Sequence, residues 1–135
     1  MHPAFAPSSR RILVVDNEHE VADMLALLIG LWGHEALVAY DGPSALAMAS
    51  ANPPDVVLLD IDLPNMSGYD LARRLRQLPE MAMALLVAIT GYGREEVQRF
   101  KESGIDLHFL KPVDPAEIRT MLAEAEKGLP AYSER

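Results

Sequence analysis

The sequence predicts a doubly wound α/β domain, in which a five-stranded parallel sheet carries helices on both faces. Five short apolar runs alternate along the chain with five segments of helical period. The apolar runs are continuous rather than alternating, which is typical of strands covered on both faces. The chain has 135 residues, enough for one domain with a substantial core and hardly enough for two.

The expected strands are rich in Val, Ile and Leu, and each stops at a polar residue or a turn. They lie at residues 12–15, 35–39, 55–59, 85–89 and 107–110. Strands that alternate with helices form βαβ units with right-handed crossovers, so few topologies are open to this chain.

Helical spacing fills the segments between these runs. The first helix has one apolar stripe, made of Val21, Met24, Leu25, Leu28 and Trp32, and Gly33 follows as a stop. Further helices are expected over residues 44–51, 69–78 and 95–103, the last closed by Gly104. In the fifth, Asp114 is placed to cap and Pro115 to open the helix. Its apolar face consists of Ile118, Met121, Leu122 and Ala125.

Composition and charge exclude several classes of function. The chain has 12 basic and 20 acidic residues and a net charge of −8, which argues against nucleic-acid binding and against docking on anionic lipid. It has no cysteine, so disulfides, thiolate zinc sites and cysteine nucleophiles are excluded. No apolar run approaches the roughly 18 residues of a membrane span, and the N-terminus lacks the pattern of a secretion signal. We therefore expect a cytoplasmic protein.

The two ends of the chain are expected to lie outside the folded domain. Residues 1–10 are predicted to form a flexible N-terminal extension and residues 128–135 a C-terminal tail, because chain ends fray unless they are tied down. The folded domain is then expected over residues 11–127.

Polar residues end four of the expected strands: Asp16, Asp60, Thr90 and Lys111. Ligands bind at the carboxyl ends of parallel strands, so these side chains are expected to converge there. Two close carboxylates favour a hard cation such as Mg²⁺, and a lysine can meet a phosphoryl oxygen as a point charge. Asp60 could then be a nucleophile that forms an aspartyl phosphate. Taken singly, Asp16 is also consistent with a helix cap or turn residue, Thr90 with the end of a strand and Lys111 with a solvated charge.

Four motifs in order carry a resemblance to a known family. They are ILVVDNE at 12–18, DVVLLDIDLPNMSG at 55–68, AITG at 88–91 and FLKP at 109–112. Together they resemble the receiver domain of the response regulators in two-component phosphorelays, over about residues 11–127. The resemblance implies a flavodoxin-like (βα)5 fold and a signalling domain rather than an enzyme. It also implies a histidine kinase or a histidine phosphotransfer domain as the phosphoryl donor.

The same resemblance implies roles for individual residues. Asp60 would accept the phosphoryl group, Thr90 would hydrogen-bond it and Lys111 would pair with it. A magnesium ion would be held by the side chains of Asp16, Asn17 and Asp60 and by the backbone carbonyl of Asp62.

Two residues depart from the family pattern. Asn17 stands where a second acid is usual, which predicts weaker Mg²⁺ binding and inefficient phosphorylation. His108 lies three residues before Lys111, where the family often has Tyr or Phe. His108 and Thr90 would then be switch residues, unless His108 is simply a half-buried strand histidine.

Positions around the site suggest further roles. Asp62 and Tyr92 flank the site and could govern the lifetime of the phosphoryl group, unless both are exposed loop residues. Arg73, Arg74 and Arg76 are expected on a solvated basic face.

The output surface, for an effector or for self-association, is expected on the fourth helix, the fifth strand and the fifth helix. It would include Val97, Phe100, His108 and Ile118.

Two alternatives remain open. A degenerate receiver would act by binding alone, without phosphorylation, and Asn17 is the argument for it. The run LLDID at 58–62 also resembles the opening motif of haloacid-dehalogenase-type Mg²⁺ phosphatases, with Asp60 as nucleophile and Asp62 as acid/base. Against that enzyme, the run lies on the third expected strand, Leu63 follows it, and the chain has no room for a substrate cap.

Overall fold

Five strands pair in parallel in a single sheet of order β2-β1-β3-β4-β5, in the computed structural model, which describes residues 9–125. The strands are β1 (Arg11–Val15), β2 (Glu35–Ala39), β3 (Val56–Leu59), β4 (Leu85–Thr90) and β5 (Leu107–Leu110). The expected N-terminal extension over residues 1–10 and the tail over 128–135 lie largely outside the described residues.

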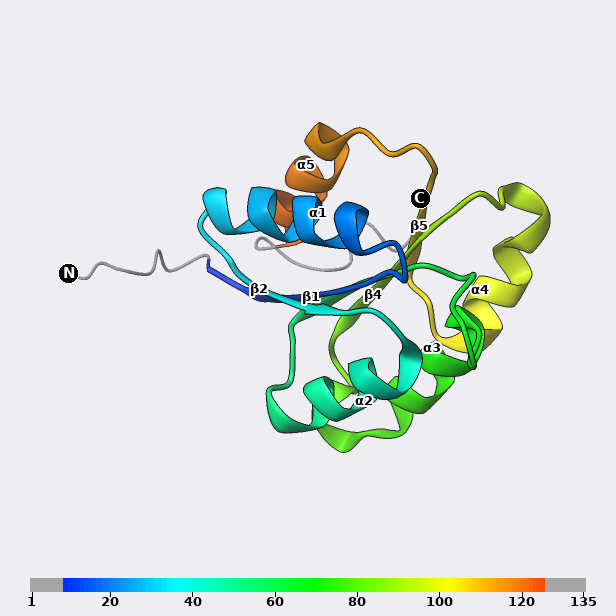
Figure 1. The fold of residues 1–135 in the computed structure, drawn as a ribbon. Coiled ribbons are helices and arrows are strands. Elements are labelled where there is room, and N and C mark those ends of the chain that lie inside the picture. The colour runs from blue at the N-terminus through cyan, green and yellow to red at the C-terminus, as the bar shows by residue number, and fades with distance from the viewer. Residues whose placement is uncertain (1–8, 126–135) are drawn as a thin grey trace.

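Within residues 9–125, five helices cover the two faces of the sheet. They are α1 (His19–Leu31), α2 (Gly42–Ala51), α3 (Gly68–Gln77), α4 (Val97–Ser103) and α5 (Pro115–Ala125), with 3₁₀ turns η1 (Pro79–Met81) and η2 (Arg94–Glu96). Helices α1 and α5 lie on one side, and α2, α3 and α4 on the other (Figure 1). This is the doubly wound five-stranded fold that the alternation of apolar runs predicts. Within residues 9–125, no helix is long and apolar enough to cross a membrane.

The continuous apolar strands arise because successive side chains point to opposite faces. Leu13, Val57 and Leu86 join the cluster under α2, α3 and α4. Their neighbours Ile12 and Val56 join the cluster under α1 and α5. Because both faces are covered, β3 and β4 are buried along their whole length, and polar side chains lie where these strands end.

Short polar side chains begin three of the helices, and glycines end two. Asp41 and Ser67 cap α2 and α3 through the backbone N–H three residues on. As predicted, Asp114 accepts a hydrogen bond at the start of α5, from the N–H two residues on at 2.9 Å. Gly104, after α4, has φ +91°, and Gly33, after α1, has φ +99°. These left-handed conformations favour glycine and confirm the predicted helix ends.

The apolar stripe predicted for α1 is wrong in part. Ala22 and Ile29 are the fully buried residues of this helix, and Leu25 packs beside them. Val21 and Met24 are 47% and 58% exposed. The face toward the sheet is therefore turned by one position from the predicted stripe, with Ala22 and Ile29 in place of Val21 and Leu28. The fourth helix is also shorter than predicted, since η2 replaces its first turn.

Arg76 does not lie on the solvated basic face expected for it, and its side chain is only 23% exposed. Its Nε donates to the carbonyl of Gly104 at 3.0 Å and its Nη1 to that of Ala84 at 2.7 Å. Its Nη2 pairs with Asp106 at 2.6 Å. Arg76 thus joins the end of α3 to the turns that precede β4 and β5.

Trp32, the chain's single tryptophan, follows the last residue of α1. The guanidinium of Arg119, on α5, lies 5.8 Å from the centre of the indole ring, within cation–π range. Trp32 therefore contributes to the packing of α1 against α5.

Candidate functional site

The residues expected at the strand ends do meet at one edge of the sheet. Asp60 directly follows β3, and its N–H donates to the carbonyl of Val15, the last residue of β1, at 2.9 Å. Lys111 directly follows β5, and its N–H donates to the carbonyl of Thr90 at 2.8 Å. The parallel pairing thus continues one residue past the strands and places their polar successors side by side.

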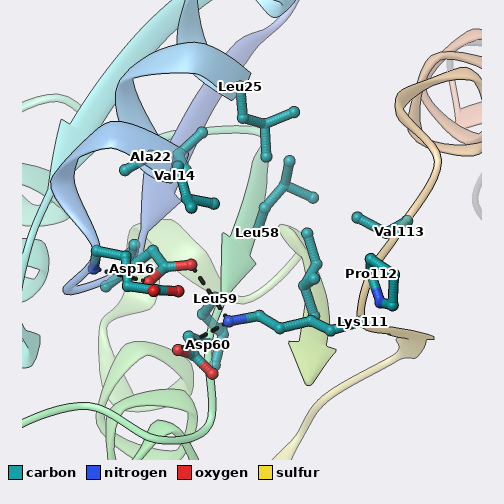
Figure 2. A pocket seen from close by; sticks show the side chains of 14 residues that line it. Val14, Asp16, Ala22, Leu25, Leu58, Leu59, Asp60, Lys111, Pro112 and Val113 are labelled. Atoms are coloured by element: carbon teal, nitrogen blue, oxygen red, sulfur yellow. Dashed lines mark hydrogen bonds and ion pairs between the residues drawn. The ribbon is translucent and has the colours of Figure 1, made fainter. Parts of the chain in front are cut away.

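Two buried carboxylates face one ammonium at this edge. The Nζ of Lys111 lies 3.2 Å from Oδ2 of Asp60 and 3.5 Å from Oδ2 of Asp16 (Figure 2). Asp16 and Asp60 are 6% and 7% exposed. The other oxygen of each carboxylate accepts a backbone N–H, from Glu18 at 2.9 Å and from Asp62 at 3.1 Å. These bonds fix the two carboxylates in place.

Burial and charge act against each other in this cluster. Burial raises the pKa of Asp60, although the N–H of Asp62 and the charge of Lys111 work in the opposite direction. Burial also acts to lower the pKa of Lys111, but the carboxylates of Asp60 and Asp16 outweigh it and hold that pKa above its ordinary value. Lys111 therefore stays charged, while burial in this site disfavours the charged form of Asp60.

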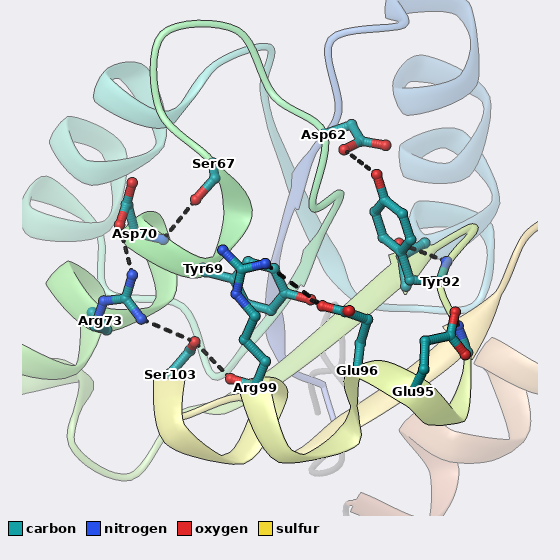
Figure 3. Close-up of polar contacts among 12 residues, drawn as sticks. Asp62, Ser67, Tyr69, Asp70, Arg73, Tyr92, Glu95, Glu96, Arg99 and Ser103 are labelled. Atoms are coloured by element: carbon teal, nitrogen blue, oxygen red, sulfur yellow. Dashed lines mark hydrogen bonds and ion pairs between the residues drawn. The ribbon is translucent and has the colours of Figure 1, made fainter.

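Thr90, Asp62 and Tyr92 border the cluster. Thr90 is fully buried at the end of β4, and its Oγ accepts the N–H of Tyr92 at 3.1 Å. The Tyr92 hydroxyl donates to the carboxylate of Asp62 at 3.1 Å (Figure 3). Asp62 and Tyr92 are therefore not independent loop residues, because together they span the gap between the segments that follow β3 and β4.

The other predicted residues lie farther out. Asn17 is exposed, directly after Asp16. His108 is half-buried on β5, with its ring centre 4.9 Å from that of Phe100. The output surface predicted from four residues is wrong for Phe100 and Ile118, which are 3% and 0% exposed. These two belong to the apolar clusters on opposite faces of the sheet, so no single surface contains both.

A pocket of about 470 Å³ opens beside the carboxylates. Apolar side chains of α1 and of the sheet form one wall, and Pro112 and Val113 form the other (Figure 2). Asp16, Asp60 and Lys111 are part of its lining. The buried carboxylates are therefore reachable from this side.

The oxygen donors fit a magnesium ion. Among the described residues, no group of three or more His, Cys, Asp or Glu side chains is arranged to hold a metal ion. Mg²⁺ does not need such a group, because it keeps several waters and binds through one or two carboxylates. The pair Asp16 and Asp60 meets that requirement, and none of the described residues that line the pocket beside them is a histidine or a cysteine.

Sequence reasoning missed the partnership of Tyr69 and Glu96. Tyr69, on α3, is 2% exposed, and its hydroxyl donates to Glu96 at 2.6 Å (Figure 3). The helical period does mark Tyr69 as buried. A buried tyrosine hydroxyl requires a partner, and that requirement is the available signal.

Fold and site together define a doubly wound α/β domain with an acidic pocket at the carboxyl edge of its sheet. The sequence matches the family model of the response regulator receiver domain over residues 12–123. The chain therefore belongs to the response regulator receiver family.

Individual relatives agree with this assignment. Sporulation initiation phosphotransferase F of Bacillus subtilis is 32% identical over 126 residues, which cover 93% of this chain and 98% of that protein. The sensor histidine kinase RcsC of Salmonella typhi is 38% identical over 112 residues, 83% of this chain but only 12% of the kinase. The structure of the chemotaxis response regulator CheY4 of Vibrio cholerae superposes with a TM-score of 0.81 at 25% identity, covering 86% of this chain and 98% of that one.

Membership confirms three predictions: the receiver family, the (βα)5 flavodoxin-like fold and a signalling function rather than an enzymatic one. Support for a haloacid-dehalogenase-type phosphatase is thereby removed. Receiver domains bind Mg²⁺ at their acidic pocket, and the family works with histidine kinases and phosphotransfer proteins.

Proposed function

We propose that residues 11–127 form a phosphoaccepting receiver domain in which Asp60 takes a phosphoryl group from a phosphohistidine donor with the help of Mg²⁺. One observation carries the proposal: the Asp60 carboxylate lies at a pocket rim, 3.2 Å from the Lys111 ammonium and beside buried Asp16. The proposed location of the domain is the cytoplasm, as the composition of the sequence predicts.

The transfer needs an ionised carboxylate and neutralisation of the incoming charge. An oxygen of Asp60 attacks phosphorus, the phosphorus–nitrogen bond breaks, and the imidazole of the donor leaves with the electron pair. Lys111 already faces Oδ2 of Asp60 and meets the phosphoryl oxygens as a fixed charge. Bound Mg²⁺ supplies Lewis-acid neutralisation of the same oxygens.

Four oxygens are proposed to hold the ion, from the side chains of Asp16, Asn17 and Asp60 and the backbone carbonyl of Asp62. Asn17 is the weak member, since an amide oxygen brings no formal charge. Thr90 is proposed to leave the Tyr92 N–H and to turn its hydroxyl to the phosphoryl group. The bond between Tyr92 and Asp62 is proposed to hinder the approach of water to the phosphoryl group.

The α1 surface is the proposed docking face for the donor, a histidine kinase or a histidine phosphotransfer domain. Val21, Met24 and Leu27 are about half exposed, at 47%, 58% and 59%, and Leu31 is 73% exposed. A groove of about 310 Å³ between α1 and α5 continues this apolar surface. Large exposed apolar patches mark interaction sites, and this one borders the pocket that leads to Asp60.

The output surface is proposed on α4, β5 and α5, where it would bind an effector or a second copy of the chain. Val97 and His108 are half-buried there, and Leu110 is 53% exposed. Thr90 and His108 are the proposed switch residues. A phosphoryl group shifts this surface only if Thr90 and Lys111 interact with it differently in the two states.

Intact-mass measurement after incubation with acetyl phosphate and Mg²⁺ tests the proposal. The wild-type chain should gain the mass of one phosphoryl group, and Asp60→Asn should gain none. Asp55→Asn, which changes a carboxylate at the start of β3, is the matched control and should be labelled like the wild type. A wild-type chain that stays unlabelled, also with a phosphohistidine donor, would refute the proposal. That outcome would favour the alternative that Asn17 suggests, a degenerate receiver that acts by binding alone.

A further inference from the structure

Two tyrosine–carboxylate hydrogen bonds join the segment after β3 to the segment after β4 (Figure 3). In the outer bond, Tyr92 donates to Asp62 at 3.1 Å, and these residues follow Thr90 and Asp60 by two positions. In the inner bond, Tyr69 donates to Glu96 at 2.6 Å, between α3 and the start of α4. The inner bond lies outside the proposed phosphoryl and metal site, and its role is not explained by that chemistry.

Tyr69 is tied closely to the backbone of the phosphoacceptor strand. Its neighbour Gly68 has no room for a side chain, because a Cβ there would lie 2.5 Å from the carbonyl oxygen of Asp60 and 2.6 Å from the Cα of Ile61. The Gly68 N–H also donates to the Ile61 carbonyl at 2.8 Å. The start of α3 is therefore pressed against the residue that follows β3, and the Tyr69 hydroxyl has a fixed position relative to Asp60.

The Tyr69 ring is also held from the α4 side. The Arg99 guanidinium lies 4.1 Å from its ring centre, and the Phe100 ring packs at 5.8 Å. Arg99 is also 3.7 Å from the Glu96 carboxylate. Burial and the bond to Glu96 raise the pKa of Tyr69 far above its ordinary value, so its hydroxyl remains a donor at any working pH.

Glu96 lies at the end of a short segment that begins at Thr90, the last residue of β4. It is the last residue of η2, directly before α4, and its N–H donates to the Gly93 carbonyl at 3.0 Å. At the other end, the Thr90 hydroxyl oxygen holds the N–H of Tyr92. If Thr90 moves toward Asp60, the backbone between Tyr92 and Glu96 must therefore change conformation, because the bond from Tyr69 holds Glu96 in place.

We propose that Tyr69 is a positioning residue for phosphorylation: its hydroxyl, through Glu96, holds the start of α4 and the loop from Thr90 in the unphosphorylated arrangement. The inference rests on the proposed phosphoacceptor role of Asp60. The bond stabilises the resting state, so a chain without it moves Thr90 to the phosphoryl group at a lower cost in free energy. Loss of the Tyr69 hydroxyl should then favour the phosphorylated state.

The test is the affinity for beryllofluoride, a phosphoryl analogue, at saturating Mg²⁺, measured by isothermal titration calorimetry. Tyr69→Phe keeps the ring and removes only the hydroxyl, and it should bind about tenfold more tightly, the factor that corresponds to one hydrogen bond to a charged acceptor. Glu96→Ala should bind more tightly by a similar factor. Glu96→Gln keeps an acceptor and should stay closer to the wild type.

Tyr40→Phe is the matched control, because it also removes a tyrosine hydroxyl from a carboxylate, that of Asp23 at 2.7 Å. Tyr40 follows β2, which β1 and β3 separate from β4 in the sheet. Its affinity should not change. A purely structural role would lower thermal stability in Tyr69→Phe without tightening beryllofluoride binding. Unchanged or weaker binding in both Tyr69→Phe and Glu96→Ala would overturn the inference. A wild-type chain that binds no beryllofluoride would instead refute the phosphoacceptor role itself, and the inference with it.

Discussion

Replacing Arg76 by alanine should destabilise the domain strongly, although sequence alone places Arg76 on a solvated face. The guanidinium donates to the carbonyls of Gly104 and Ala84 at 3.0 and 2.7 Å and pairs with Asp106 at 2.6 Å. Its side chain is only 23% exposed, so water replaces these bonds incompletely after truncation. Hydrogen bonds to charged groups contribute about 1.5–3 kcal/mol each and are not additive, so we expect a loss of about 2–4 kcal/mol.

Urea unfolding followed by circular dichroism measures this loss. The midpoint should fall while the m value stays unchanged, because the folded and unfolded states remain as compact as before. Arg74→Ala is the control on the same helix; its side chain is exposed, and it should change stability by less than about 0.5 kcal/mol. Arg76→Lys should recover little of this stability, since an ammonium cannot reproduce the planar set of N–H donors that a guanidinium provides. A loss below about 1 kcal/mol in Arg76→Ala would refute the reasoning.

Three further predictions concern the site. Asn17→Asp should tighten Mg²⁺ binding about tenfold, because it adds a charge beside the ion, and equal affinities in a Mg²⁺ titration would reject this. Tyr92→Ala should shorten the lifetime of the aspartyl phosphate several-fold, as water gains access; the decay of the phosphorylated mass measures it, and an unchanged decay would rule out shielding. Burial raises the pKa of Asp60 above its unfolded value, so the folded chain binds this proton more readily and loses stability as pH rises through the folded pKa. Without Mg²⁺, Asp60→Asn should therefore be more stable than the wild type at neutral pH but not at about pH 3; a neutral-pH urea midpoint no higher than the wild type's would contradict this.

The strand ends could be predicted because the physics that determines them is local. Strands covered on both faces must be apolar throughout, so the polar residue that ends each run stands out in the sequence. Parallel pairing then brings those ends together, as the contacts of Lys111 with Asp16 and Asp60 show. Neither step needs knowledge of the strand order.

Contacts between distant segments could not be predicted in the same way. Tyr69 and Glu96 are 27 residues apart, and their bond depends on how α3 and α4 lie next to each other. The sequence predicts Phe100 and Ile118 on one surface because both lie on expected helices next to the fifth strand. The sheet separates them, and only the strand order reveals which helix covers which face.

The position of the single indole determines what an optical measurement on this protein reports. Trp32 follows a helix of 13 residues, about 20 Å long, whose opposite end lies next to the acidic pocket. We therefore expect its emission to report the contact between α1 and α5 rather than the surroundings of Asp60. Tryptophan fluorescence should then follow the separation of these two helices on unfolding.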